Sequence, residues 1–491
     1  MRVFVFGIGG TGARVLRSLA MLLASGLKLD HSNLEIIPII IDMDAHNGDT
    51  ARTRDVFRSY HTIRKAFVAA GANSQSDSFF NTIIKPFNRL DSNASDITDI
   101  DLQFDFQNRT DTFAQFIQYN TLDQSNKDIL ELLYNDSTNP ADFPELHLDL
   151  SVGFKGNPNI GSVVFNDLAA SPEFKNLESA YTVNDRIFIV SSIFGGTGSS
   201  GFPTLVKLIR NSTNPHLKGT KLGAVTVMPY FNVDAVDDSA IKSALFTTKT
   251  KAALSFYEND TDIRSINALY YIADPNQTGS LPNVEGGREQ INDAHVIELL
   301  AATAITDFIS KQDEQLATPA HYEFGAETDS NPLTIAHLSP NTKERYIKPL
   351  VRFAYAAQIA TKFVPRLSDN RFYGPKELNI SAKMGLPNEY HKLLSFFESF
   401  KKWVSAEMSN SRNGRVLNTF LFDDPETLNN MIVGKSIPST WLAKGLTQSK
   451  IAEKLNKFLD KEQANLPAPQ KYQNILFKTA TDCLDVLGQL P

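Results

Sequence analysis

The chain has 491 residues, of which 42% are hydrophobic and 21% charged, as is typical of a globular protein with two or more subdomains. A formal net charge of −7 argues against a dominant nucleic-acid-binding surface, and no apolar run approaches the roughly 20 residues that a membrane span needs. A single cysteine, Cys483, excludes an intrachain disulfide and, together with the lack of a secretion signal at the start, favours a cytoplasmic location.

The first fifty residues predict a strand, a turn, a helix and a second strand. Residues 2–6 form a short apolar run, and residues 13–24 repeat apolar side chains at helical spacing. Residues 34–41 are nearly all Ile, Leu and Pro, as in a buried parallel strand. This order indicates an α/β fold with a doubly wound, mostly parallel sheet, in which ligands bind at the carboxyl ends of the strands.

An enlarged segment at residues 50–150 interrupts this pattern and is expected to be mixed and mostly helical. It carries a polar stretch at residues 93–111, expected to be a surface insertion, and a predicted helix at residues 128–134. After residue 150 the predicted strands and helices again alternate regularly. The predicted strands lie at 186–192, 221–228 and 266–273, and the predicted helices between them at 202–210 and 240–257.

A long central helix is predicted at residues 292–310, after a loop at residues 274–291. It is apolar on several faces, so we expect it to be buried between two subdomains. We place a second α+β domain at residues 311–440 and C-terminal helices at 441–491. The elements expected there are a strand at 333–338 and helices at 345–364, 391–408 and 449–462.

Two glycine-rich turns each separate an expected strand from an expected helix. The first is Gly7-Ile8-Gly9-Gly10-Thr11-Gly12, and the second is Gly195-Gly196-Thr197-Gly198-Ser199-Ser200-Gly201. A turn of this kind lets backbone N–H groups approach an anion at the positive end of a helix, and glycine permits the close approach. Together the two turns predict one phosphate chain held from two sides.

A dinucleotide-binding Rossmann domain is one alternative. Gly7, Gly9 and Gly12 satisfy its glycine fingerprint, and Asp42 ends the second strand where a ribose-binding acid would lie. That interpretation has no use for the second glycine turn, which follows a later strand of the same sheet.

The loops, taken in order, resemble those of the tubulin/FtsZ superfamily of GTPases. Residues 188–199 resemble the strand and the signature Gly-Gly-Gly-Thr-Gly-Ser/Thr-Gly loop, with Phe194 in place of the first glycine and Ser200 before or in place of the last. Residues 7–12 correspond to the first nucleotide loop. Three further segments are similar to FtsZ loops: Asp42-Met43-Asp44-Ala45, residues 153–161, and Met228-Pro229-Tyr230-Phe231.

This resemblance covers residues 1–310 and is closest to divergent bacterial tubulin-like proteins. It implies a nucleotide-binding domain for GTP or GDP with Mg²⁺, and a magnesium contact of Asp44 through water. The phosphate loops would be Gly9, Gly10, Thr11 and Gly12, then Gly195, Gly196, Thr197, Gly198 and Ser199, with Arg14 as an added charge. Gly156 and Asn157 would lie at the terminal phosphate, beside the unexpected cation Lys155. Asp234 would contact the ribose, and Asn276 and Asn292, with Asp293 or His295, the base.

The resemblance also implies a catalytic contribution from a neighbouring subunit, because tubulin and FtsZ complete the site with acids that follow the central helix. The corresponding stretch holds Asp313, Glu314, Glu323, Glu327 and Asp329, but lacks the Asn-x-Asp-x-x-Glu pattern. Glu323, Glu327 and Asp329 are the candidate catalytic acids, with solvated surface charges as the alternative.

Two functions therefore stay open. One is a GTPase that assembles head to tail into filaments, and the other is a nucleotide-binding module of a multiprotein assembly that does not polymerise. An Asn amide at the base favours guanine, while the sequence leaves adenine open.

Overall fold

The structure is a computed structural model. It describes residues 1–44, 46–90, 102–104, 106, 108–135, 144–235, 241, 243–274, 280–284, 286–323, 330, 332–365, 389–409, 416–422, 427–438, 445–461 and 466–491.

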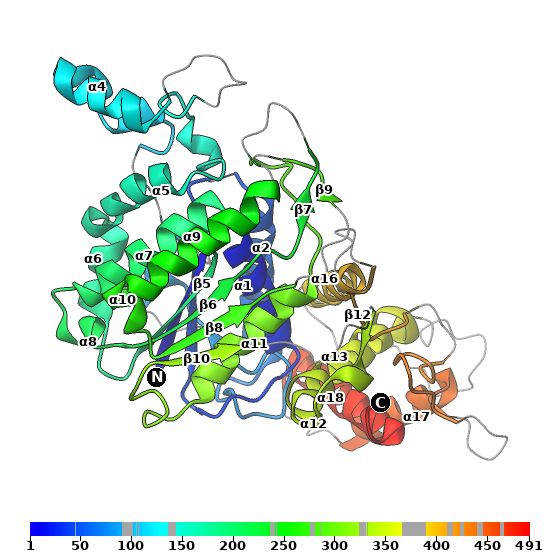
Figure 1. Ribbon diagram of the computed structural model, residues 1–491. Helices are drawn as coiled ribbons and strands as arrows, with labels where there is room; N and C mark the ends of the chain where they lie inside the picture. Colours follow the sequence, from blue (N-terminus) through cyan, green and yellow to red (C-terminus); the bar gives the residue numbers. More distant parts are fainter. Residues whose placement is uncertain are drawn as a thin grey trace.

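An eight-stranded parallel sheet forms the centre of the molecule (Figure 1). Its order is β10-β8-β6-β5-β1-β2-β3, and β4 also pairs with β2. These strands are β1 (Arg2–Ile8), β2 (Glu35–Ile41), β3 (Ile83–Ile84), β4 (Gln103–Phe104), β5 (Arg186–Ser192), β6 (Lys221–Val227), β8 (Ala268–Ile272) and β10 (Ala320–Glu323). The chain order runs outward in both directions from β1, so the predicted doubly wound α/β class is confirmed. The topological switch lies between β1 and β5, where ligands of such sheets bind.

The two faces of the sheet are covered by different helices. Alternate residues of β1 point to opposite faces, so Val3 and Val5 pack in one hydrophobic core while Phe4 and Phe6 pack in the other. The first core holds α1 (Gly9–Ala24), α2 (Gly48–Phe67) and α11 (Val296–Ser310). The second holds α5 (Pro158–Phe165), α6 (Pro172–Ala180), α7 (Gly196–Arg210), and parts of α9 (Phe246–Asn259) and α10 (Thr261–Arg264). The short α8 (Pro215–Lys218) follows α7.

Helices α1 and α7 begin inside the glycine-rich turns, at Gly9 and Gly196, and not at residues 13 and 202 as the apolar spacing predicted. The reason is close packing of the helix starts. A Cβ on Gly12 would lie 2.4 Å from the carbonyl carbon of Gly7, and a Cβ on Gly198 would lie 2.2 Å from the carbonyl oxygen of Ser192. Glycine thus allows the first helical turn to press directly against the preceding strand.

The central helix α11 begins at Val296, so the predicted start at residue 292 is wrong. His295 is its N-cap: its Nδ1 accepts a hydrogen bond from the backbone N–H of Ile297 at 3.1 Å. The carboxylate of Glu298 in turn accepts from the backbone N–H of His295 at 3.3 Å. This reciprocal capping box fixes where the helix starts. As predicted, the helix is buried over most of its surface, and it packs against α1, β6 and β8.

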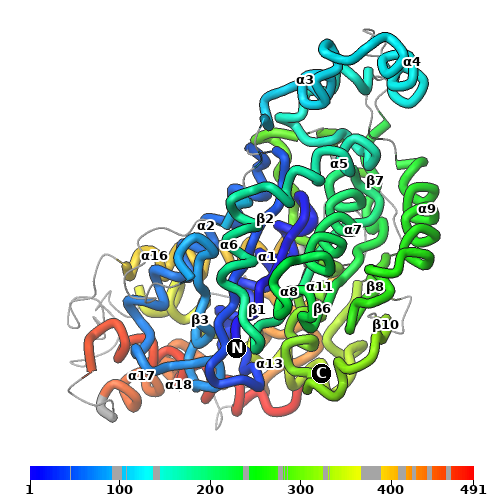
Figure 2. Tube along the Cα trace, turned by 90° about the vertical axis from the view of Figure 1, so that its left-hand side faces the viewer, coloured from blue at the N-terminus to red at the C-terminus, as the bar shows by residue number. Residues whose placement is uncertain are grey.

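The enlarged segment adds more than helices. β3 and β4 extend the sheet beyond β2, and the small helices α3 (Phe113–Phe116) and α4 (Gln124–Leu133) project from the body beyond α5 (Figures 1 and 2). α4 overlaps the predicted helix at 128–134. Most of the polar stretch at 93–111 lies outside the described residues.

The C-terminal part packs against the α1–α2 side of the sheet (Figure 1). The expected strand at 333–338 is only β11 (Leu333–Thr334), paired with β12 (Leu417–Asn418), and it gives way to a 3₁₀ turn (Ile335–His337). α12 (Pro340–Thr342), two π-helical turns (Lys343–Ile347 and Ile359–Phe363), α13 (Lys348–Gln358), α16 (Glu389–Ser409), α17 (Gln448–Lys461) and α18 (Ala468–Leu487) follow. Phe79, which follows α2, packs against two of these C-terminal helices. Its ring centroid lies 5.1 Å from that of Phe353 in α13 and 5.0 Å from that of Phe477 in α18. The domain division at residues 310 and 440 stays a prediction. Within the part of the chain that the structure describes, every helix is too short or too polar to cross a bilayer.

Candidate functional site

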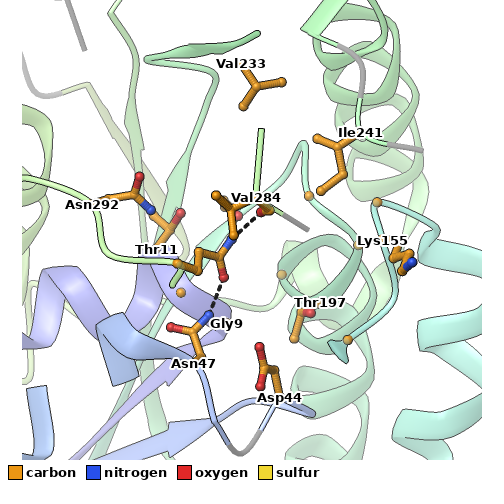
Figure 3. Close-up of a pocket in the computed structure, with 18 of the residues that line it drawn as sticks. Gly9, Thr11, Asp44, Asn47, Lys155, Thr197, Val233, Ile241, Val284 and Asn292 are labelled. Carbon is orange, nitrogen blue, oxygen red and sulfur yellow. Dashed lines mark hydrogen bonds between the residues drawn. The ribbon is translucent and has the colours of Figure 1, made fainter. Parts of the chain in front are cut away.

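A cavity of about 440 Å³ opens at the carboxyl ends of β1, β2, β5 and β6, across the switch point of the sheet (Figure 3). This volume lies within the range of pockets for small ligands. A two-stranded sheet of β7 (Asn232–Val233) and β9 (Ser280–Leu281) adjoins it, and Val233, Pro282 and Asn283 from these strands and the segment after them join the lining.

Three glycine loops that are far apart in the sequence meet at this cavity. A Cβ on Gly9 would lie 3.4 Å from the Cβ of Thr197, so the first and second loops are in contact. A Cβ on Gly196 would lie 3.0 Å from the backbone nitrogens of both Gly156 and Asn157, so the second loop also contacts the third. Side chains at Gly9 or Gly196 would therefore fill the space between the loops.

The helices that start at two of these loops have N-termini suited to an anion. Among the described residues, no side chain caps the start of α1 or α7, and neither first turn carries an acid. By contrast, Asn47 caps α2 and Asn157 caps α5 with their side-chain oxygens. The first N–H groups of α1 and α7 are thus the ones left for a ligand, at the positive ends of two helix dipoles.

Most of the residues predicted from the sequence lie together in the cavity wall. Figure 3 shows several of them around the same space. The predicted residues in the lining are Gly9, Gly10, Thr11, Asp44, Gly156, Gly195, Gly196, Thr197, Gly198 and Asn292, together with Arg14, Lys155 and Asp293.

Other described residues from the prediction lie outside the lining, each for a visible reason. Gly12 packs against Gly7 beneath the loop, and Asn157 caps α5 and donates to Glu145. The Ser199 hydroxyl donates to the carbonyl of Gly195, and Asp234 accepts from Ser280 at the surface. His295 caps α11 and is fully buried.

The predicted catalytic acids fall in different places. Glu327 and Asp329, like the predicted base contact Asn276, lie outside the described residues. Glu323 is exposed at the end of β10 and is not part of the lining. Asp313 lies at the opposite edge of the sheet from the cavity, where its carboxylate accepts from Arg186, the first residue of β5, at 2.8 Å.

Two carboxylates after β2, Asp42 and Asp44, stand in the cavity wall. Asp44 accepts from the backbone N–H groups of Gly287 at 2.6 Å and His46 at 2.9 Å. Burial, and then the charge of Asp44, raises the pKa of Asp42 to about 7. No cluster of three or more metal-binding side chains occurs among the described residues. A divalent cation here would need ligand phosphates and water besides these acids, which is how Mg²⁺ is usually held.

Replacing Asp42 should change how stability depends on pH. The pKa of Asp42 is about 7 when folded, against about 3.9 for an unperturbed aspartate. Its stabilising effect is therefore complete below about pH 4 and is lost as pH rises through 7. We expect Asp42→Asn to be more stable than the wild type at pH 8, with the difference in unfolding free energy narrowing by pH 5 and closing near pH 4. Urea denaturation across this range measures it, with the exposed Asp128→Asn as control. A constant gap at all pH values would contradict the expectation.

Arg14, predicted as an added charge at the phosphates, donates hydrogen bonds to four protein side chains. Its guanidinium donates to Glu298 at 2.7 Å, to Asp49 at 2.8 Å, to the Tyr230 hydroxyl at 2.9 Å and to the Thr11 hydroxyl at 3.1 Å. This buried network joins the first glycine loop to α2 and α11. From the sequence alone, the one sign of this network is a cation placed one helical turn after the first glycine loop.

Lys249 was missed by sequence reasoning. It reaches the cavity from α9, and its ammonium donates to the carbonyl oxygen of Gly156 at 2.6 Å. Burial lowers its pKa below the ordinary value. The loop it contacts holds Lys155, which lines the cavity with a left-handed backbone (φ 45°). Two lysines thus lie at the third loop.

Phe194, which departs from the glycine signature, packs in an aromatic cluster beside the loops. Its ring lies 5.0 Å from that of Phe246, 5.7 Å from that of Phe231 and 6.4 Å from that of Tyr230. Phe194, Phe231 and Phe246 also line the cavity, so one wall is apolar and the glycine loops form another. Such a two-sided wall suits a ligand with a charged end and a flat apolar part.

Comparison with known proteins gives only distant matches. No family model and no curated protein matches the chain. Among solved structures, FtsZ from M. jannaschii (a single-residue mutant) is 14% identical over 55% of this chain and 46% of its own, with a TM-score of 0.24. CetZ2 from Haloferax volcanii, solved as a GTPγS-bound protofilament, is 12% identical over 63% of this chain and 58% of its own, with a TM-score of 0.28. The chain therefore spans about half of one and less than two thirds of the other.

Proposed function

We propose that this chain is a tubulin-like protein that binds a guanine nucleotide, GTP or GDP with Mg²⁺, in the cavity at the switch point. The observation that carries the proposal is the meeting of three glycine loops, with the uncapped N-termini of α1 and α7, around one cavity. Phosphates are the ligands that such helix ends hold best.

Each wall of the cavity then has a role. Backbone N–H groups of the loops at Gly9–Thr11 and Gly196–Gly198 would hold the phosphates. Lys155 and Lys249 would neutralise charge at the third loop, and Asp44 would hold Mg²⁺ through water, where the ion would offset the phosphate charge. Asn292 and Asp293, between β9 and α11, would contact the base. The ring of the base would pack against the apolar wall near Phe231.

The arrangement of the two edges of the sheet supports a proposal of self-assembly. The cavity lies at the carboxyl edge, while the acidic loop after α11 begins at the amino edge, with Asp313 72% exposed beside Arg186. A copy stacked head to tail would bring Asp313 and Glu314, at the start of this loop, to the cavity of its neighbour, whereas Glu323 at the end of β10 lies at the carboxyl edge. Acids at that place could orient a water for phosphoryl transfer, a reaction that depends mainly on positioning and charge. We therefore propose a GTPase completed by the next subunit, with filaments controlled by the nucleotide.

A module that binds nucleotide without polymerising is the second candidate, and one observation favours it. α4 projects from the body (Figure 2). Three of its apolar side chains are exposed to solvent. They are Ile129, Leu132 and Leu133. An exposed apolar stripe of this kind is typical of a contact with another protein. The dinucleotide alternative is less favoured because the second glycine loop also lines the cavity.

The test separates binding from assembly. Nucleotide released from the purified, heat-denatured protein is identified by ion-exchange chromatography, and GTP and ATP affinities are measured with Mg²⁺. Pelleting and negative-stain imaging with GTP, GDP and a slowly hydrolysed analogue follow. We expect bound guanine nucleotide and filaments with the triphosphate. Binding without filaments at any concentration would favour the module, and no nucleotide binding would overturn the whole proposal.

A further inference from the structure

Asp49 lies directly behind the wall of the cavity without being part of its lining. It stands in the first turn of α2, and its side chain is fully buried. Burial alone would raise the pKa of its carboxyl, but three nearby guanidinium groups outweigh burial and hold the pKa below the ordinary value. These groups belong to Arg14, Arg17 and Arg52. The carboxylate is therefore ionised at neutral pH.

The carboxylate of Asp49 binds two residues that do line the cavity. Its Oδ2 accepts from Arg14 Nη1 at 2.8 Å and from the side-chain Nδ2 of Asn292 at 3.1 Å. Its Oδ1 accepts from the backbone N–H of Asn292 at 3.2 Å and from Arg52. One buried group thus fixes both the backbone and the side chain of Asn292.

This contact decides which way the amide of Asn292 is turned. An ionised carboxylate can only accept hydrogen bonds, so the NH₂ of the amide must face Asp49, and not its oxygen. The acceptor Oδ1 is then the atom that the amide offers to a ligand in the cavity. The neighbouring residue Asp293 also lines the cavity and carries a carboxylate, which is again an acceptor.

We infer that Asp49 is a positioning residue that sets the base selectivity of the site, although it does not touch the base. The inference rests on the proposed nucleotide function. Guanine presents two neighbouring donors on its Watson–Crick edge, N1–H and the N2 amino group, and these match two acceptors. Adenine presents one donor beside the bare acceptor N1, which two acceptors would repel. A site whose buried polar groups stay unpaired with the wrong ligand rejects it.

Asp49→Asn should relax this selectivity. An Asn side chain can donate as well as accept, so the amide of Asn292 is free to turn its NH₂ toward the ligand. We expect the ratio of the ATP and GTP dissociation constants to fall about tenfold, the loss of roughly one hydrogen-bond preference. Both constants are measured by displacement of a fluorescent nucleotide with Mg²⁺, and folding is checked by circular dichroism.

Glu298→Gln is the matched control. Glu298 is as buried as Asp49, and it too accepts from Arg14, at 2.7 Å, but its carboxylate holds the backbone of His295 and the Tyr230 hydroxyl, not Asn292. We expect this variant to lower affinity for both nucleotides and to keep their ratio within about twofold, because the amide of Asn292 stays fixed.

Asn292→Ala keeps the buried carboxylate of Asp49 paired with Arg14 and is a second, independent test of the inference. The ratio of its ATP and GTP dissociation constants should fall as in Asp49→Asn. The double variant with both substitutions should show no further fall, since the two residues act through the amide of Asn292. Three results would overturn the inference while nucleotide binding itself stands. The first is a ratio of ATP and GTP dissociation constants in Asp49→Asn or Asn292→Ala equal to that of the wild type. The others are additive falls of this ratio in the double variant and an equal fall in Glu298→Gln. A wild type that binds no nucleotide would overturn the proposed function first.

Discussion

Gly195→Leu is expected to lower nucleotide affinity at least about a hundredfold, or about 2.7 kcal/mol, while the fold stays intact. Gly195 precedes α7, lines the cavity and has an extended backbone (φ −92°, ψ 169°) that any residue can adopt. The nearest atom to an added Cβ is the Ser192 hydroxyl oxygen at 3.5 Å, an ordinary contact. The leucine would therefore fit the protein and occupy space at the start of the second glycine loop, where we propose that the phosphates bind. Titration with a fluorescent guanine nucleotide measures the loss.

Gly71→Leu is the control for this substitution. Among the described residues nothing lies within 4 Å of a Cβ added there, and Gly71 is exposed and away from the cavity lining. It should bind nucleotide like the wild type. Undiminished affinity in Gly195→Leu would contradict the assignment of this loop to the phosphates. Gly198→Trp should also abolish binding, but it would strain the fold, since even a Cβ there meets Ser192.

Arg14→Met is expected to destabilise the protein by about 3–5 kcal/mol, because it removes the guanidinium that two buried carboxylates share. Asp49 keeps its contact with Arg52, whereas Glu298 loses the donor at 2.7 Å. Asp49 and Glu298 are both fully buried and both accept from Arg14. Methionine restores apolar volume but no donors. Without the Arg14 guanidinium, the pKa of Asp49 in the folded state rises, and a raised pKa means stability lost as pH rises. The deficit should therefore be larger at pH 8 than at pH 5. Urea denaturation at both values measures it.

Arg17→Met is the matched control, one turn further along α1. Burial, and then the charge of Arg52, lowers the pKa of Arg17 to about 10, so its charge is poorly accommodated. Its nearest carboxylate oxygen, on Asp49, is 4.0 Å away, and its buried Nε has no hydrogen-bond partner among the described residues. Replacing such a charge by an apolar side chain often costs little or stabilises. We expect a change within about 1 kcal/mol. Equal losses in the two variants would show that Arg14 contributes only packing.

Local patterns in the sequence were enough to predict the main sheet. Apolar runs gave the strands β1, β2, β5, β6 and β8 nearly to the residue, because strands buried on both faces are apolar throughout. The helix starts were less predictable. The apolar spacing predicts loops at the glycine turns, yet α1 and α7 begin within them, since their helical geometry depends on packing against strands.

The functional assignments divide in the same way. Sequence motifs located the three glycine loops. All three line the same cavity, because the carboxyl ends of parallel strands lie at one edge of the sheet. Motifs could not separate residues that face a ligand from residues that support them. His295 was a candidate for the base and is a helix cap, while Ser199 bonds its own helix and Asp234 lies at the surface.

The order of strands, glycine loops and helices could be read from local patterns, and with it the edge of the sheet where the cavity opens. These features depend on neighbours within a few residues, such as apolar periodicity and glycine's freedom of backbone angle. The partners of the buried charges became known from the three-dimensional packing alone. Arg14 meets Glu298 across 284 positions, and Lys249 meets Gly156 across 93. Hydrogen bonds between such distant groups depend on how helices pack on the sheet, and no local pattern records that.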